Sequence, residues 1–236
     1  MTTKERLYIF DTTLRDGQQT QGVTFSLDDK LRISQLLADI GIDYIEGGWP
    51  GANPVDSEFF DKKRDFGKTK LVAFGMTKRF GRSVENDETL AQVISAGTSV
   101  VCLVGKSHDF HVQKALGISL DENVELITSS IKHLKSLGKE VHFDAEHFFD
   151  GFAANKKYAI LIVKEAMAAG ADWVVLCATP SSIKLSTVAF TWSGMQPPLV
   201  SHKTTQSAPA AIASLIIEIA YFLLAAKPSK KCSASK

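Results

Sequence analysis

The stretch LYIFDTTLRDGQQT, residues 7–20, joins a short apolar run directly to a polar segment rich in Thr, Asp, Arg and Gln. Its first half, residues 7–13, is β-prone and predicts a buried strand. A surface turn does not require an Arg beside an Asp where such a strand ends. Arg15 and Asp16 are therefore either an ordinary cap with a surface ion pair or functional groups at the mouth of a sheet.

Predicted strands and helices alternate along the next 160 or so residues. Each strand–helix unit takes roughly 30 residues, as expected of βα repeats. Short apolar runs alternate with patterns of helical spacing, and Ser119 with Glu122 forms a capping-box signature. We expect strands at residues 7–13, 43–48, 70–75, 98–105, 139–147 and 171–177, and helices at 27–41, 54–64, 85–97, 119–138 and 154–170. This alternation predicts a parallel sheet with crossover helices.

Two parallel architectures fit this pattern, a (β/α)₈ barrel and a doubly wound sheet. Polar residues follow most of the strands, at Arg15 and Asp16, at Glu46, and at residues 144–147. Barrels take catalytic groups from several strand ends, whereas doubly wound sheets concentrate them at one switch point. No G-x-G-x-x-G follows the first strand. The sequence therefore favours an α/β fold of the TIM (β/α)₈ type, incomplete because six units are legible instead of eight.

After Thr179 the rhythm stops, and the chain becomes rich in Ser, Thr and Pro. We expect two parts, a partial catalytic barrel over residues 1–179 and a divergent, partly disordered tail over 180–236. The apolar stretch at 212–226 carries Glu218 and is shorter than the roughly 20 residues that a membrane span needs. It predicts a buried helix or an unpacked tail, and no membrane partner.

Bulk properties narrow the class of protein. The chain has 27 Lys and Arg against 26 Asp and Glu, so its net charge of +1 does not favour a nucleic-acid partner. Three widely spaced cysteines, Cys102, Cys177 and Cys232, form no metal-type pair and indicate a reducing compartment. The first residues show no secretory pattern. We therefore expect a cytoplasmic protein.

The segment HFDAEHFFDG, residues 142–151, holds further candidates. Strand alternation places His142, Asp144 and Glu146 on one side. Buried charges need partners, so this strand lines either a polar barrel centre or a half-exposed edge. Asp144 is a candidate substrate-binding residue on this face.

Two other sites are less specific. Glu46 ends an apolar strand and is followed by two glycines, which suits either a site residue or a plain polar strand end. His108 and His111 could share one helical face. Because no third ligand is close in sequence, we interpret both histidines as structural.

The stretch DTTLRDGQQ closely resembles the signature of the DRE-TIM, or pyruvate-carboxyltransferase-like, metal-dependent barrels. This family includes 2-isopropylmalate, homocitrate and citramalate synthases and hydroxymethylglutaryl-CoA lyases. The stretches that resemble the citramalate synthase branch are DYIEGGWPGANPVDSEFF, LVAFGMTKR, VGKSHDFHVQKALG, GKEVHFDAEHFFDGF and AGADWVVLC. The resemblance runs over residues 7–179. It implies a Claisen-type acyltransferase that condenses acetyl-CoA with pyruvate in isoleucine biosynthesis.

The resemblance also implies roles for individual residues. Arg15 matches the arginine that stabilises oxyanion charge, and Asp16 matches a ligand of a divalent Mg²⁺ or Mn²⁺ ion that polarises the keto group. Glu146 matches the acid–base carboxylate, and Glu46 a second-strand carboxylate used in some relatives. The remaining matches, both expected to bind substrate, are Gln19, which closes the motif, and Thr179, which contacts the 2-oxo acid.

The chain departs from the family pattern after the sixth strand. The family reads D-T-N-G-G there, whereas this chain reads ATPSS, residues 178–182. The family's H-x-H metal ligands are absent, and His202 stands alone. We therefore expect impaired condensation. The alternatives are a 2-isopropylmalate or homocitrate synthase-like enzyme, or a catalytically silent remnant. We expect a homodimer or a pairing with a full-length relative.

Overall fold

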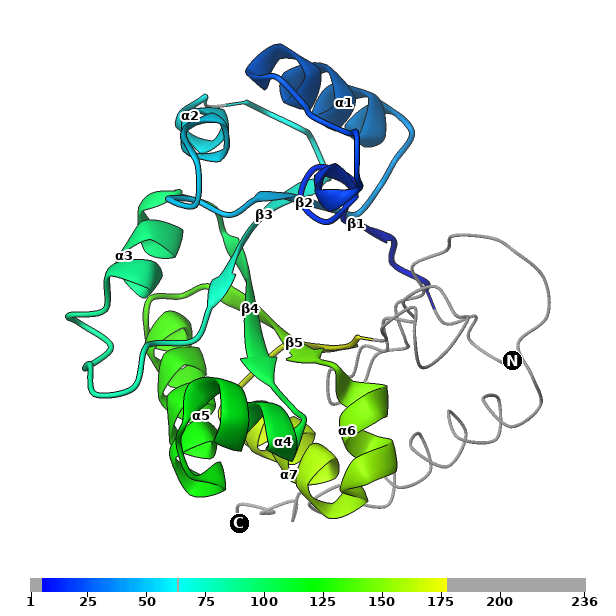
Figure 1. The fold of residues 1–236 in the computed structure, drawn as a ribbon. Coiled ribbons are helices and arrows are strands. Elements are labelled where there is room, and N and C mark those ends of the chain that lie inside the picture. The colour runs from blue at the N-terminus through cyan, green and yellow to red at the C-terminus, as the bar shows by residue number, and fades with distance from the viewer. Residues whose placement is uncertain (1–5, 63, 178–236) are drawn as a thin grey trace, which may run out of the picture. The chain divides into compact units, whose positions relative to one another are not determined.

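A computed structural model describes residues 6–62 and 64–177. Strands and helices alternate along this part of the chain (Figure 1). The strands are β1 Phe10–Asp11, β2 Tyr44–Gly48, β3 Lys70–Met76, β4 Val100–Lys106, β5 Glu140–Glu146 and β6 Trp173–Leu176. The helices are η1 Gly17–Gln19, α1 Leu27–Asp39, α2 Pro54–Asp61, α3 Glu88–Ser95, α4 Asp109–His111, η2 Val112–Leu116, α5 Leu120–Ser136, α6 Phe148–Ala154 and α7 Lys156–Ala168. The predicted order of elements is confirmed.

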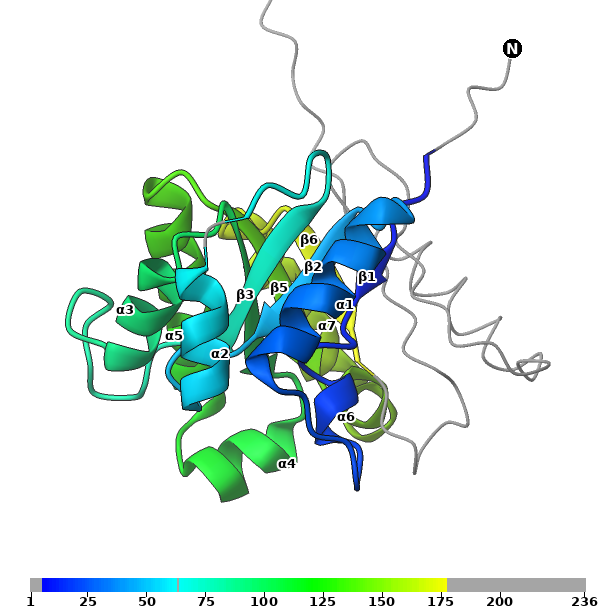
Figure 2. The same ribbon diagram turned by 90° about the horizontal axis from the view of Figure 1, so that it is seen from above.

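The six strands form one parallel sheet in the order β1-β2-β3-β4-β5-β6. The sheet curls, and α1, α2, α3, α5 and α7 cover its outer side (Figures 1 and 2). Each strand is followed by a crossover to its immediate neighbour, which is the topology of a (β/α) barrel rather than of a doubly wound sheet. The described residues therefore build an incomplete barrel, as predicted.

Local sequence explains where the longest helix begins and which face it buries. Ser119 Oγ accepts a hydrogen bond from Glu122 N at 3.2 Å, and the Glu122 carboxylate accepts one from Ser119 N at 2.7 Å, so the predicted capping box is formed. Helix α5 then buries Ile127 and Ile131. Gly105 lets this helix approach the sheet, because a Cβ there would lie 3.0 Å from Ile127 Cγ1 of α5.

The inner face of the curled sheet holds a core of its own. Its buried apolar members are Phe10, Tyr44, Val72, Phe74, Val100, Cys102, Val104, Trp173 and Val175. These residues occupy alternate positions along the strands, as the pleat of a barrel strand requires. The inner face is thus packed mainly with apolar side chains, and His142 is buried among them against Phe10 and Tyr44.

Several elements differ from the predictions in their bounds. The strand expected at residues 7–13 is only Phe10–Asp11, because the chain turns at Thr12. Helix α2 ends at Asp61, and the helices after β4 and β5 that precede α5 and α7 were not predicted. Within residues 6–62 and 64–177, no helix is both long and apolar enough to cross a membrane. The tail at 180–236, with His202, Cys232 and the stretch 212–226, lies outside the described residues, as does Thr179.

Candidate active site

The loop after β1 presents its polar side chains through a tight backbone turn. The Thr12 carbonyl accepts hydrogen bonds from the backbone N–H groups of Arg15, Asp16 and Gly17, at 3.1, 2.8 and 3.1 Å. The Leu14 side chain is fully buried and anchors the loop. Arg15 and Asp16 are thereby held at the carboxyl end of the first strand, where barrel enzymes place functional groups.

Arg15 forms the central contact of the site. Its Nε donates to Glu46 Oε2 at 2.6 Å, and its Nη1 lies 3.3 Å from Asp16 Oδ1. The guanidinium also lies 4.0 Å above the centre of the Phe74 ring. Burial alone lowers the pKa of Arg15, but Glu46 and Asp16 outweigh it and raise that pKa. Arg15 is therefore a fixed positive charge in a mostly buried position.

Glu46 lies in the middle of β2 rather than at the strand end predicted for it, and it is almost completely buried. Burial raises the pKa of Glu46 above its ordinary value, against the opposing effect of Arg15. Cys102, on the inner face of β4, is close enough to Glu46 for the two groups to influence each other's pKa. Burial raises the pKa of Cys102 well above its ordinary value, so this group stays a neutral thiol. Sequence reasoning missed Cys102, although its alternate position in a buried strand was a usable signal.

Asp144 carries an unsatisfied oxygen. Its side chain is 8% exposed on the inner face of β5, and Oδ1 has no hydrogen-bond partner in the described part of the chain. Burial raises the pKa of Asp144 to about 7, with Glu46 and Glu146 adding to the effect and Arg15 opposing it. Near neutral pH this carboxyl group can therefore carry a proton and donate it to a ligand.

Glu146 and a group of histidines form the rim. Lys106 Nζ lies 2.6 Å from Glu146 Oε2, so the acid–base candidate has a cationic partner from β4. The His111 ring stacks on His108 with centroids 4.7 Å apart and meets His147 edge-on at 4.6 Å. Burial, with the charges of His147 and His108, lowers the pKa of His111.

His147 has an unusual backbone conformation. It has a φ of 55° and is the one described non-glycine residue with a positive φ. Such conformations cost energy and cluster at functional sites. Sequence spacing did not indicate the contact between His147 and His111, because the two residues come from loops after different strands.

A buried ion pair supports the site from behind. Lys30 is fully buried, donates to the Gly47 carbonyl at 2.9 Å and pairs with Asp56. Asp56 Oδ2 accepts a hydrogen bond from Trp49 N at 2.9 Å, and Gln18 Nε2 donates to Oδ1 at 3.4 Å. Asp56 therefore ties the loop after β1 to the loop after β2.

The structure brings most of the predicted site residues to one end of the sheet. Arg15, in the loop after β1, is coupled electrostatically to Glu46 of β2 and Asp144 of β5, and Glu146 is close enough to influence Asp144. Asp16 lies at the rim, with 56% of its side chain exposed. Gln19 is exposed, and its neighbour Gln18 is the amide that turns inward.

Comparison with known proteins identifies the family of this chain. The HMGL-like family profile matches residues 6–196. This chain belongs to the HMGL-like family. It is 52% identical over 177 residues to the (R)-citramalate synthase of Aquifex aeolicus and 48% identical over 178 residues to that of Streptomyces coelicolor. A 2-isopropylmalate synthase of Sulfolobus acidocaldarius is 31% identical over 170 residues.

This chain matches these relatives over only part of their length. The first match covers 74% of this chain and 34% of the Aquifex aeolicus protein, so the chain spans about a third of the citramalate synthases it matches. The match to the 2-isopropylmalate synthase covers 71% of this chain and 41% of that protein. The resemblance to the citramalate synthase branch is confirmed.

Solved structures support the fold. The HMG-CoA lyase of Bacillus subtilis matches with a TM-score of 0.66 at 16% identity, covering 97% of this chain and 67% of that one. The HMG-CoA lyase of Pseudomonas aeruginosa matches with a TM-score of 0.58 at 17% identity, covering 74% and 58%. At such identities the likeness shows the HMGL-like barrel fold and nothing about substrate.

The donor set of this HMGL-like barrel does not match the expected divalent metal. Among the described residues, no three His, Cys, Asp or Glu side chains are arranged to hold a metal ion. Asp16 offers one exposed carboxylate, and the unpaired oxygen of Asp144 is close enough to Arg15 to be influenced by its positive charge. Mg²⁺ and Mn²⁺ prefer several oxygen ligands in regular geometry. The described residues alone therefore do not fit this metal.

Proposed function

We propose that this HMGL-like barrel is the catalytic part of a citramalate synthase-type acyltransferase, which condenses acetyl-CoA with pyruvate in isoleucine biosynthesis. The observation that carries the proposal is the identity of 48–52% to (R)-citramalate synthases from Aquifex aeolicus and Streptomyces coelicolor, against 31% to a 2-isopropylmalate synthase. We further propose that condensation by the chain as it stands is impaired.

The described residues suit the charge changes of a Claisen-type condensation. The methyl carbon of acetyl-CoA loses a proton and attacks the keto carbon of pyruvate, and the keto oxygen gains negative charge. Water then cleaves the thioester and releases free CoA. Arg15 is the group that stabilises the oxyanion, because it is a fixed cation in a mostly buried position.

Two carboxyl groups share the proton transfers. Asp144, with a pKa of about 7, holds a proton that it can give to the new alkoxide. Glu146, held by Lys106, is the candidate base for the methyl proton. Glu46 positions Arg15 through the 2.6 Å hydrogen bond and binds no substrate itself. Gln19 and Thr179 remain candidates for contact with the 2-oxo acid.

The expected impairment follows from the metal donors. A bound Mg²⁺ or Mn²⁺ would polarise the keto group of pyruvate. Asp16 is its candidate ligand in this chain, and the described residues do not complete the set. The same observation favours a second candidate function, a silent subunit that pairs with itself or with a full-length relative.

The test measures free CoA released from acetyl-CoA by the purified chain with Mn²⁺ present. Slow release that requires pyruvate, and that disappears in Arg15→Ala, is the expected result. Faster release with 2-oxoisovalerate than with pyruvate would instead assign the 2-isopropylmalate-type reaction. If neither acid causes CoA release and the chain forms a stable complex with a full-length citramalate synthase, the result would favour the silent-subunit function over the enzyme function. An Asp16→Ala variant, titrated with Mn²⁺ by calorimetry, shows whether the proposed ligand contributes.

A further inference from the structure

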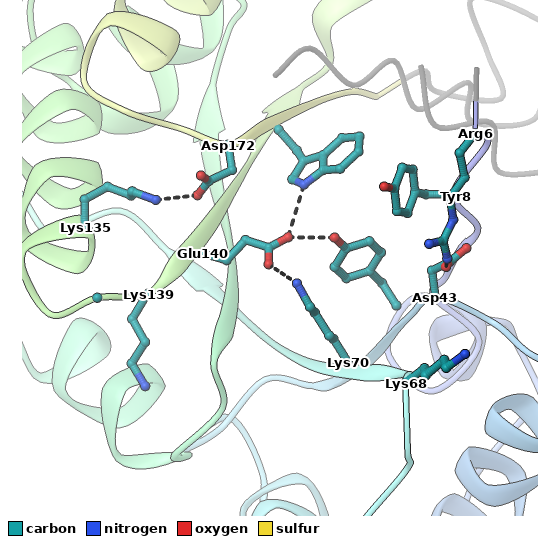
Figure 3. A pocket seen from close by; sticks show the side chains of 12 residues that line it. Arg6, Tyr8, Asp43, Lys68, Lys70, Lys135, Lys139, Glu140 and Asp172 are labelled. Carbon is teal, nitrogen blue, oxygen red and sulfur yellow. Dashed lines mark hydrogen bonds and ion pairs between the residues drawn. The ribbon is translucent and has the colours of Figure 1, made fainter. Parts of the chain in front are cut away.

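A cavity lies at the opposite end of the strands from the candidate active site. We call it the basal pocket. Its volume is about 680 Å³, which is within the range of small-molecule sites. It opens where β2, β3, β5 and β6 begin (Figure 3). The lining residues are Arg6, Tyr8, Asp43, Tyr44, Lys68, Lys70, Lys135, Gly138, Lys139, Glu140, Asp172 and Trp173.

The basal pocket has a surplus of positive charge. Its cationic residues are Arg6, Lys68, Lys70, Lys135 and Lys139, and its acidic residues are Asp43, Glu140 and Asp172. The surplus is two positive charges, in a chain whose net charge is only +1. Charge of one sign gathered in a concave site raises the local concentration of ligands of the opposite sign.

Glu140 is fully engaged by the protein. Its carboxylate accepts hydrogen bonds from Tyr44 Oη at 2.7 Å and Trp173 Nε1 at 3.1 Å, and it also pairs with Lys70 (Figure 3). Burial alone raises the pKa of Glu140, but hydrogen bonds from His142, Lys70 and Tyr44 outweigh it and hold that pKa well below its ordinary value. Glu140 is therefore ionised and saturated, and it does not compete for a further cation.

The other two carboxylates also cap backbone groups. Asp172 Oδ2 accepts hydrogen bonds from Val141 N at 2.7 Å and from Lys135 Nζ at 2.6 Å. Asp43 Oδ2 accepts one from Ile9 N at 2.9 Å. Both side chains are thus committed to holding the starts of strands.

Lysine donors remain available. Lys68 is exposed and has no salt bridge among the described residues. Lys139 Nζ donates to the Thr98 carbonyl at 2.5 Å, and an ammonium group has three donors. Figure 3 shows Lys68 and Lys139 on opposite sides of the pocket, with Lys68 on the side of Asp43 and Tyr8. Lys68 is therefore the lysine that offers both charge and hydrogen bonds to an anion on that side.

One wall of the basal pocket is aromatic. The Tyr8 ring meets the Trp173 ring edge-on, with centroids 5.2 Å apart, and Tyr44 lies 6.1 Å from Trp173. The Arg6 guanidinium lies 4.5 Å above the Tyr8 ring. Such a wall suits the organic part of a ligand, and the cavity is larger than an inorganic phosphate ion requires.

We propose that the basal pocket binds a small organic phosphate monoester. A phosphate monoester carries about −1.5 to −2 charges at pH 7, which matches the surplus of two positive charges. Its oxygens accept hydrogen bonds from the Lys68 ammonium group, and its organic part lies against the aromatic wall. This inference does not rest on the proposed catalytic function, because the site lies at the other end of the sheet.

The experiment titrates phenyl phosphate into the full chain by calorimetry at low ionic strength. We expect one site per chain and a dissociation constant at least tenfold larger for Lys68→Glu. The matched control is Lys114→Glu, which reverses the charge of an exposed lysine in η2, beyond the carboxyl end of β4. This variant should leave the affinity for phenyl phosphate unchanged. Because Lys68 is exposed, the variant should fold, and its urea midpoint verifies this.

Two further arms make the proposal falsifiable. Inorganic phosphate should bind at least threefold more weakly than phenyl phosphate, and an equal affinity would overturn the assignment to an ester. Binding should weaken as salt rises, because exposed charges are screened. No heat with phenyl phosphate at millimolar concentration, or equal losses in Lys68→Glu and Lys114→Glu, would overturn the site itself.

Discussion

Two carboxyl groups on the same face of β5 differ sharply in their surroundings. Glu140, at the base, accepts hydrogen bonds from Tyr44 and Trp173 and pairs with Lys70, and its pKa is held well below the ordinary value. Asp144, at the mouth, is buried with an unpaired oxygen, and its pKa is raised to about 7. Burial acts in the same direction on both groups, so the available partners decide which of them ionises.

The two carboxyl groups show that the two ends of the barrel have different roles. At the base, carboxylates are saturated and hold the starts of strands together. At the mouth, polar groups are left incompletely paired, which costs stability and leaves them free for a ligand. The most sensitive tests of this contrast change one carboxyl group at a time.

The largest expected effect is a change in the pH dependence of stability in Asp144→Asn. An acid whose pKa rises on folding, here from 3.8 to about 7, favours the fold most at low pH, and this contribution is lost as pH rises through that window. Asn stays neutral throughout. The stability of Asp144→Asn relative to wild type should therefore increase by up to roughly 4 kcal/mol between pH 4 and pH 8.

Urea unfolding at a series of pH values measures this difference. The control is Asp29→Asn in the α1 capping box, because hydrogen bonds from Ser26 lower the pKa of Asp29. Its contribution is present at high pH and is lost as pH falls, so the control should show the opposite slope. A flat difference for Asp144→Asn would mean that this carboxyl group is not raised in pKa, and the contrast along β5 would disappear.

The next effect is on the base. Glu140→Gln removes the charge that satisfies Lys70, Tyr44 and Trp173, and should lower the free energy of unfolding by about 3 kcal/mol. The matched control is Glu125→Gln, which breaks the 3.0 Å pair between the exposed Glu125 and Lys78 and should cost less than about 1 kcal/mol. Equal losses of unfolding free energy in the two variants would show that the contacts of Glu140 stabilise the fold no more than an ordinary surface ion pair does.

The smallest effect concerns ligand binding at the mouth. Arg15→Lys keeps the positive charge but cannot donate through Nε to Glu46 while presenting further donors to a carboxylate. We expect pyruvate to bind about tenfold more weakly, or about 1.4 kcal/mol, by calorimetry. Arg32→Lys on the exposed face of α1 is the control. Unchanged affinity in Arg15→Lys would remove Arg15 from the substrate site.

Local signals in the chain predicted much of the fold. The capping box of α5 and the order of the strands and main helices were correct, because periodicity and caps depend on neighbouring residues. The early end of β1 was not predicted. It comes from a turn in which three N–H groups donate to the Thr12 carbonyl, and the residue types alone do not indicate this turn. The choice between Gln18 and Gln19 also required three dimensions, because Asp56 comes from another loop.

The sequence by itself determined the barrel class, the family, and the placement of Arg15, Asp16, Glu46, Asp144 and Glu146 in strands or in the loop that follows one, because these follow from short-range order and motif. Only the tertiary structure decided how these groups are paired. The contacts of Arg15 with Glu46 and of Lys106 with Glu146 join different strands. The protonation of Asp144 and the surplus charge of the basal pocket depend on the same kind of proximity. Electrostatic interaction acts through space, and residues far apart in the chain set it.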